Sequence, residues 1–170
     1  MMTRRSSLAW IGRASLAGLA GLALGGCGFK LRASQNFSFQ TIAVMPPGGA
    51  IAVQLRRSFG DTVRVLTPEE PLTQAQVVVD ILREQREKTV VGVNSSGQVR
   101  EFQLRIRVKF RVRTPQGVEL TPETDILQQR DISFNESAVL AKEAEEAMLY
   151  RDMQNDIVQQ LMRRLATVKI

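Results

Sequence analysis

The stretch that most constrains the fold is LRIRVKFRVR, residues 104–113. Every even-numbered residue in it is apolar, from Leu104 to Val112, and every odd-numbered residue is a cation, from Arg105 to Arg113. Strict alternation over this length is typical of a β-strand that buries one face and exposes the other. Because neighbouring cations on one face repel each other, we expect anionic groups or full hydration beside them.

The segments around this strand predict a meander of three long antiparallel strands. The turn-forming NSSG at 94–97 joins an apolar-then-charged segment at 75–91 to the alternating strand at about 99–114. The TPQG turn at 114–117 leads into a third long strand at about 122–134. Short strands are expected at 41–45 and 62–66, with a short helix over 48–59 between them.

The last segment, residues 137–168, predicts a long helix with Ser137 as its N-cap. Its apolar residues share one broad face from Leu140 to Leu165. Two helices cannot cover both faces of a sheet this wide. The predicted fold is therefore an α+β two-layer sandwich: a mixed, mostly antiparallel β-sheet with two helices, one short and one long and C-terminal, packed on one face.

In this fold the cations of the alternating strand lie on the open face of the sheet. One explanation for them is local neutralisation by acidic residues of the neighbouring strands. The other is contact with a phosphate-bearing ligand or a polar partner, which we expect toward the hairpin end, whereas the far end should be hydrated or paired across strands. The expected counter-charges are Glu123, Asp125, Asp131, Asp80 and Glu84, and the cations at the far end are Arg111 and Arg113.

Residues 1–26 have the pattern of a secretory signal peptide. Arg4, Arg5 and Arg13 precede or flank an apolar run that is too short for a comfortable membrane span. Half of the net charge of +6 comes from these arginines, and export argues against nucleic acid as the partner of the basic strand.

The apolar run ends in LGGC, residues 24–27, which resembles a bacterial lipobox. Cys27 is therefore expected to begin the mature chain and to carry an N-acyl group and an S-diacylglycerol, which together give stable membrane anchoring. The Gly28 that follows favours the outer membrane. The expected organisation is a removed signal peptide at 1–26, a lipidated N-terminus and tether at 27–40, and a single domain at 41–170.

Catalysis has little support in the sequence. The chain contains no His, its single Cys is expected to be lipidated, and no residues have metal-ligand spacing. We therefore expect a protein that is not an enzyme and that carries no cofactor beyond the acyl groups on Cys27.

After the lipobox, CGFKLR at 27–32 resembles the start of the LPS-assembly lipoprotein family LptE, also called RlpB. The stretches GQVREFQL at 97–104, LAKEAEEAMLYRDM at 140–153 and QLMRRL at 160–165 are similar too, so the resemblance covers the mature chain nearly end to end. It implies a lipoprotein on the periplasmic side of the outer membrane. Such a protein plugs and helps to assemble the LptD β-barrel and binds lipopolysaccharide during its delivery to the outer leaflet.

The resemblance also implies where the ligand binds. Basic residues near one end of the sheet are associated with lipid A in this family, and Lys142 matches the Lys of its LAK motif. Some relatives carry a basic residue where this chain has Ser95 and Ser96, and Arg100 is positioned to substitute for it. The meander brings the hairpin, Arg100 and the helix start to one end of the sheet. The expected phosphate-binding residues are Arg100, Arg105 and Lys142.

A second class of function is a periplasmic solute- or lipid-carrier lipoprotein that acts without a barrel partner. The two classes predict different surfaces. A barrel plug should carry mixed polar groups on nearly all sides, whereas a carrier should contain an apolar pocket of ligand size.

Overall fold

The computed structural model of the chain describes residues 35–170. The predicted signal peptide and the lipidation site Cys27 lie outside these described residues. Gln35–Ile170 form one compact unit. This unit begins before the predicted boundary at residue 41, because Phe39 is buried in the core and Phe37 packs against Phe59 with ring centroids 5.4 Å apart.

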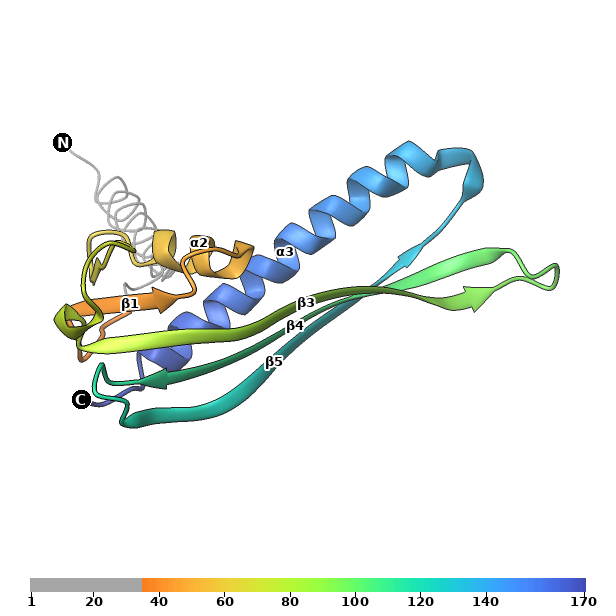
Figure 1. Cartoon of the computed structure of the whole chain (residues 1–170). Coiled ribbons are helices and arrows are strands. Elements are labelled where there is room, and N and C mark those ends of the chain that lie inside the picture. The colour runs from red at the N-terminus through yellow and green to blue at the C-terminus, as the bar shows by residue number, and fades with distance from the viewer. Residues whose placement is uncertain (1–34) are drawn as a thin grey trace, which may run out of the picture. The chain divides into compact units, whose positions relative to one another are not determined.

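The sheet has five strands in the order β2-β1-β3-β4-β5 (Figure 1). The first strand, β1, runs parallel to both of its neighbours, and the last three strands form the predicted antiparallel meander. The strands are β1 (Thr41–Met45), β2 (Arg64–Val65), β3 (Val77–Val93), β4 (Val99–Arg113) and β5 (Glu119–Ser133).

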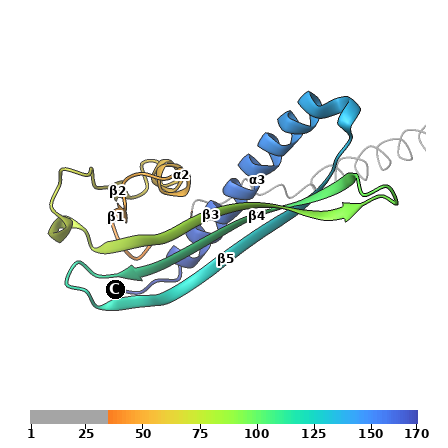
Figure 2. The ribbon, with the colours of Figure 1, turned by 45° about the vertical axis from the view of Figure 1, so that its right-hand side comes forward.

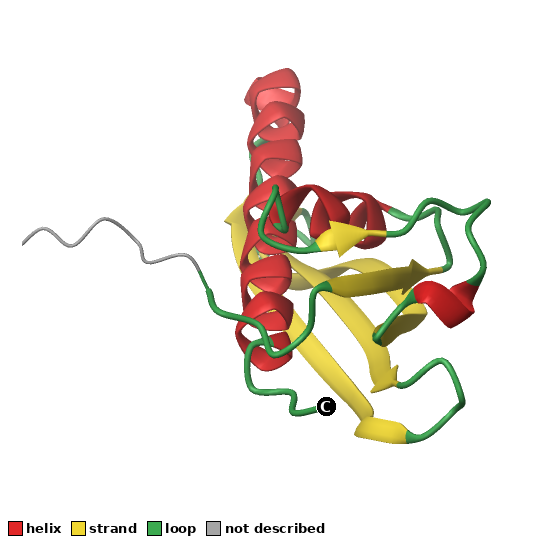
Figure 3. Cartoon of the chain, turned by 90° about the vertical axis from the view of Figure 1, so that its left-hand side faces the viewer, coloured by secondary structure: helices red, strands yellow, loops and turns green. Residues whose placement is uncertain are grey.

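The two α-helices of residues 35–170 lie on one face of this sheet, which confirms the predicted two-layer α+β fold (Figure 3). The short helix α2 (Ala50–Ser58) ends before Gly60, whose φ of 54° lies in the left-handed region that glycine tolerates. The long helix α3 (Val139–Leu165) closes the chain. Single 3₁₀ turns, η2 (Leu72–Gln74) and η3 (Glu136–Ala138), precede β3 and α3.

The alternating strand forms the centre of the core, as its pattern predicts. Leu104, Ile106 and Phe110 on β4 are fully buried on the helix side. The C-terminal half of α3 covers them with apolar residues of its own, including Ile157 and Leu161. Burial of these large side chains on both layers fixes which face of β4 points outward, so the cations lie on the open face.

A β-bulge in β3 reverses the direction of the side chains that follow it. Ile81 pairs with Phe110 but Arg83 pairs with Lys109, so Leu82 is an extra residue in the ladder. Asp80, before the bulge, faces the cations, whereas Glu84, after it, faces the helices. The prediction that Glu84 neutralises the cations is therefore wrong: its carboxylate accepts a hydrogen bond from the N–H of Ile51, at the start of α2, at 3.2 Å.

Helix α3 begins differently from the prediction. Asn135 caps the preceding 3₁₀ turn η3, where its side chain accepts a hydrogen bond from the Ser137 N–H at 3.0 Å, and α3 itself begins after Ala138 without a side-chain cap. The apolar face predicted from Leu140 onward is buried only from Met153 to Leu165, and Leu140 itself is 82% exposed. Figures 1 and 2 show the N-terminal half of α3 rising away from the sheet toward the hairpin end.

Candidate functional site

A cleft separates the N-terminal half of α3 from the sheet, and we call it the helix–sheet cleft. It contains two adjoining cavities of about 580 and 220 Å³ that share Lys88, Glu143 and Glu146. The larger cavity lies between α3 and β3, and the smaller one lies between α3, β4 and the end of β5. The cleft exists because α3 presents small and charged residues here instead of the large apolar residues that its C-terminal half buries.

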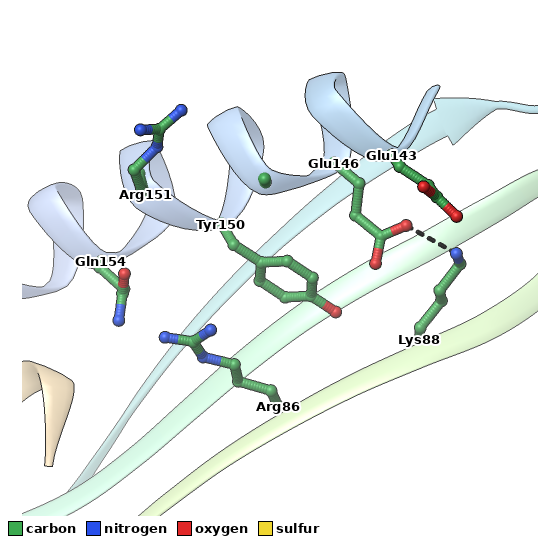
Figure 4. Close-up of a pocket in the computed structure, with 8 residues that line it drawn as sticks. Arg86, Lys88, Glu143, Glu146, Tyr150, Arg151 and Gln154 are labelled. Carbon is green, nitrogen blue, oxygen red and sulfur yellow. Dashed lines mark hydrogen bonds and ion pairs between the residues drawn. The ribbon is translucent and has the colours of Figure 1, made fainter. Parts of the chain in front are cut away.

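The bulge in β3 supplies the charged floor of the cleft. By pointing Glu84 toward the helices it also points Arg86 and Lys88 there, since side chains two residues apart share a face. Lys88 forms an ion pair with Glu146 of α3 at 2.6 Å, and its ammonium lies 4.3 Å from the centroid of the Phe102 ring. Figure 4 shows this ion pair bridging β3 and α3 at one end of the larger cavity.

Tyr150 divides the larger cavity. Its hydroxyl donates a hydrogen bond to the backbone carbonyl of Glu87 at 2.9 Å, and the guanidinium of Arg86 lies 5.4 Å from its ring centroid. Burial raises the pKa of Tyr150, the nearby Glu146 carboxylate raises it further, and Arg86 opposes the rise. The phenol therefore stays protonated at neutral pH and acts as a donor that holds α3 to β3.

The smaller cavity has an apolar wall and a cationic rim. Phe102 and Phe134 pack edge to face with centroids 5.3 Å apart, and Ile132 and Val139 complete the wall. Lys142 lies at the rim. Its ammonium donates to the Ser133 hydroxyl at 3.0 Å and to the Glu145 carboxylate at 2.9 Å. An anion that binds Lys142 must therefore compete with Glu145.

The three predicted phosphate-binding residues do not form one cluster. Lys142 lies in the helix–sheet cleft. Arg100 is the extra residue of a bulge in β4, exposed near the hairpin, and lines neither cavity. Arg105 points to the open face, on the opposite side of the sheet from α3, and its guanidinium donates to Gln103. Within the described residues no hydrogen bond or ion pair joins these three side chains, and their part in ligand binding stays a prediction.

The cations on the open face are paired with acidic side chains mainly at the end of the sheet away from the β3–β4 hairpin. Arg111 and Arg113 each donate to Asp80 at 2.8 Å, which confirms the predicted pairing across strands. Burial by itself raises the pKa of Asp80, but the hydrogen bonds and charges of Arg113 and Arg111 outweigh it and hold that pKa below its usual value.

The middle of the open face is only partly neutralised. Lys109 lies 3.7 Å from Glu123 and opposite Asp125, while Asp131 accepts from Gln103 at 2.9 Å. In residues 35–170, Arg105 and Arg107 form no ion pair, so two cations stay available at this level of the sheet.

Most of the residues that line the helix–sheet cleft were not predicted from the sequence. Arg86, Lys88 and Tyr150 face one another only because of the bulge at Leu82 and the departure of α3 from the sheet. The run REQREK at 83–88 carries charges at both parities, which was a signal that neither face of β3 there enters a core. That signal does not reveal which face forms a cleft.

Residues 35–170 hold no group of three or more acidic, His or Cys side chains placed to bind a metal ion. None of the helices within this range has the length and apolar character needed to cross a bilayer.

Comparisons with known proteins agree on one family. The family model "LptE: Lipopolysaccharide-assembly" matches residues 39–165. A protein of Yersinia enterocolitica named LPS-assembly lipoprotein LptE is 29% identical over 90% of this chain and 74% of its own length. A protein of the same name from Photorhabdus laumondii is 27% identical over 90% of this chain and 84% of its own length.

Solved structures share the fold. The solution structure of an uncharacterized lipoprotein B from Nitrosomonas europaea superposes with a TM-score of 0.70, at 34% identity over 82% of this chain and 90% of that chain. The crystal structure of rare lipoprotein B from Shewanella oneidensis has a TM-score of 0.61 at 19% identity, over 75% of this chain and 92% of that chain, and is similar in fold.

Proposed function

This chain belongs to the LptE family, and from that premise we propose that it is an outer-membrane lipoprotein that binds lipopolysaccharide and forms a complex with the LptD β-barrel. The observation that carries the proposal is the match over residues 39–165, which spans all of the strands and both α-helices of the described unit. Relatives matched along 90% of this chain are named LPS-assembly lipoproteins.

The surface of the molecule supports a plug more than a carrier. Toward the β3–β4 hairpin, both faces of the sheet carry charged side chains: Arg107 lies on the open face, and Arg86 and Lys88 lie in the cleft. A carrier needs an apolar pocket of about 300–1,000 Å³. The cavity of about 580 Å³ falls in this range but is lined mainly by charged side chains. The apolar-walled cavity beside Phe102 has only about 220 Å³, too little for a whole lipid.

The barrel partnership is tested by purification. The acylated protein, extracted from outer membranes in detergent, should co-purify in a one-to-one ratio with a large β-barrel, and its depletion should lower the lipopolysaccharide exposed on the cell surface. If the protein purifies alone and surface lipopolysaccharide stays normal after depletion, the carrier function replaces the plug.

Lipopolysaccharide binding is tested by matched charge reversals in the purified described unit. We expect Lys142→Glu to weaken binding about tenfold, because a phosphate then meets a carboxylate where it met an ammonium. Arg107→Glu is the control, since Arg107 is an exposed cation on the opposite face of the sheet. Added salt should weaken the wild-type binding more than that of Lys142→Glu. Equal losses in the two variants would show that only the overall charge matters.

A further inference from the structure

One buried polar group in the helix–sheet cleft has no partner. Gln154 lies on α3 next to Met153, where the buried part of the helix begins. Only 8% of Gln154 is exposed. Its side-chain nitrogen Nε2 is inaccessible and makes no hydrogen bond within the described residues. Buried donors are nearly always satisfied in folded proteins, so this amide marks a place where an acceptor is missing.

A second set of donors faces the same cavity. Figure 4 shows Gln154 extending from α3 toward β3, and Arg86 extending from β3 toward it, both on the side of Tyr150 away from Glu146. Arg86 contacts the Tyr150 ring but forms no ion pair within residues 35–170, so its N–H groups lack a carboxylate partner. The larger cavity is therefore polarised, with unpaired donors at one end and acidic residues at the other.

The acidic end does not neutralise the donor end. The Glu146 carboxylate is already paired with Lys88 at 2.6 Å. Glu143 lies beside Lys88, beyond Tyr150 as seen from Arg86 (Figure 4). The guanidinium of Arg86 and Nε2 of Gln154 can only donate hydrogen bonds, so a ligand that binds both must supply an acceptor. The positive charge of the guanidinium favours an anionic acceptor.

We propose that Arg86 and Gln154 form a binding site for one oxyanion group, a phosphate or a carboxylate, on the head group of the lipopolysaccharide. This inference rests on the proposed function and adds to it a contact point separate from Lys142, which lines the other cavity. The guanidinium of Arg86 offers a planar set of donors to one oxyanion. Because Nε2 of Gln154 is inaccessible in the free protein, the Gln154 side chain must turn toward the cavity it lines to donate to the same oxyanion. Glu143, in the same cavity, opposes entry of a second.

The site is tested by NMR on the described unit, residues 35–170, which contains its own hydrophobic core. The side-chain amide resonances of Gln154 report directly on the hydrogen bonds of Nε2. The probes are glucose 1-phosphate, glucuronate and neutral glucose at matched ionic strength, and then purified lipopolysaccharide. We expect saturable shifts of the Gln154 amide protons with an oxyanion probe and none with glucose.

Matched variants identify the donors. Arg86→Gln should weaken the oxyanion-induced shift of Gln154 about tenfold in affinity, because the charge-assisted bonds are lost. Arg107→Gln should leave it unchanged, since Ile106, beside Arg107, pairs with Arg86 and so places Arg107 at the same level on the opposite face. The two oxyanion probes distinguish a phosphate from a carboxylate source.

The outcomes separate this inference from the proposed function. If lipopolysaccharide binds but no probe and no lipopolysaccharide shifts Gln154, the site is wrong while the proposed function stands. If small oxyanions shift Gln154 but lipopolysaccharide does not bind, the anion site stands and its proposed ligand is wrong. Equal effects of Arg86→Gln and Arg107→Gln would overturn the assignment of Arg86.

Discussion

Replacing Asp80 by Asn tests how a strand with five cations on one face is tolerated. Asp80 lies on β3 beside Arg111 and Arg113 of β4, and its carboxylate accepts hydrogen bonds of 2.8, 2.8 and 3.3 Å from them. The substitution preserves the size of the side chain, removes its charge and replaces one of its two accepting oxygens by an NH2 group. It therefore isolates the electrostatic contribution from the packing of β3 against β4.

The expected loss follows from the burial of the three side chains. The Asp80 side chain is only 12% exposed, and the side chains of Arg113 and Arg111 are 21% and 41% exposed. Hydrogen bonds to charged groups contribute about 1.5–3 kcal/mol when shielded, whereas exposed ion pairs contribute below about 1 kcal/mol. For this half-shielded cluster we expect Asp80→Asn to lower the free energy of unfolding by about 2 kcal/mol.

The assay is urea unfolding of residues 35–170 at neutral pH, with the slope against urea checked for constancy. The control is Glu123→Gln, because Glu123 lies 3.7 Å from Lys109 and both side chains are more than 40% exposed. This change should alter the free energy of unfolding by less than about 0.5 kcal/mol. Equal small losses in both variants would mean that hydration alone makes the cations tolerable.

The pH dependence gives a second check on Asp80. Its pKa in the folded protein lies below the ordinary value, so its contribution to stability is present above the pKa of the unfolded chain, about 4. That contribution is lost as the pH falls through the folded pKa. The difference in unfolding free energy between wild type and Asp80→Asn should therefore be full at pH 6 and shrink below pH 4. A difference that does not shrink as the pH falls below 4 would assign the loss to packing.

Three further predictions follow from the same contacts. Leu161→Ala should lower the free energy of unfolding by about 2–5 kcal/mol because Leu161 is fully buried, whereas Leu140→Ala on the same helix should change it by less than about 0.5 kcal/mol, both measured by urea unfolding. Glu84→Ala should cost about 1 kcal/mol in the same assay by removing the acceptor for the Ile51 N–H, and an unchanged value would show that water replaces it. Cys27→Ala should abolish the acyl mass on the mature chain, and mass spectrometry that still finds an acylated N-terminus would contradict the predicted lipidation.

Much of the sheet could be predicted because the alternation in β4 has one physical solution. Only a strand places Leu104 to Val112 in a core and the cations between them in solvent, and the turns on either side then define the meander. The turn residues Gly97 and Gly117 have positive φ angles of 81° and 94°, as hairpin turns require.

The bulge at Leu82 could not be predicted from one sequence. The pattern before it and the pattern after it are both compatible with an uninterrupted strand. An uninterrupted strand would have placed Glu84 on the open face beside Asp80, as we expected. The shift arises from tertiary contacts, because it lets Glu84 reach the start of α2 while Ile81, before the bulge, stays in the core.

The alternation of side chains along β4 also explains why Arg105 and Lys142 lie on opposite faces of the sheet. The meander correctly brings the hairpin and the start of α3 to one end of the sheet, but proximity along the sheet does not decide which face a side chain occupies. Arg105 alternates with the buried Leu104 and Ile106, so it must point away from α3. Lys88, which faces α3, is the cation that shares a cavity with Lys142.

The two halves of α3 differ in how they are held to the sheet, and both proposed binding sites lie in the less tightly held half. From Met153 to Leu165 the helix is fixed by large buried side chains, so the sheet and helix stay together without help from the N-terminal half. Between Lys142 and Tyr150 the helix contacts the sheet mainly through an ion pair and single hydrogen bonds, which contribute little to stability at an exposed surface. Charge substitutions in the helix–sheet cleft can therefore change what it binds while the fold persists. This separation makes the binding experiments on Arg86 and Lys142 interpretable, because a loss of binding there does not reflect a loss of folded protein.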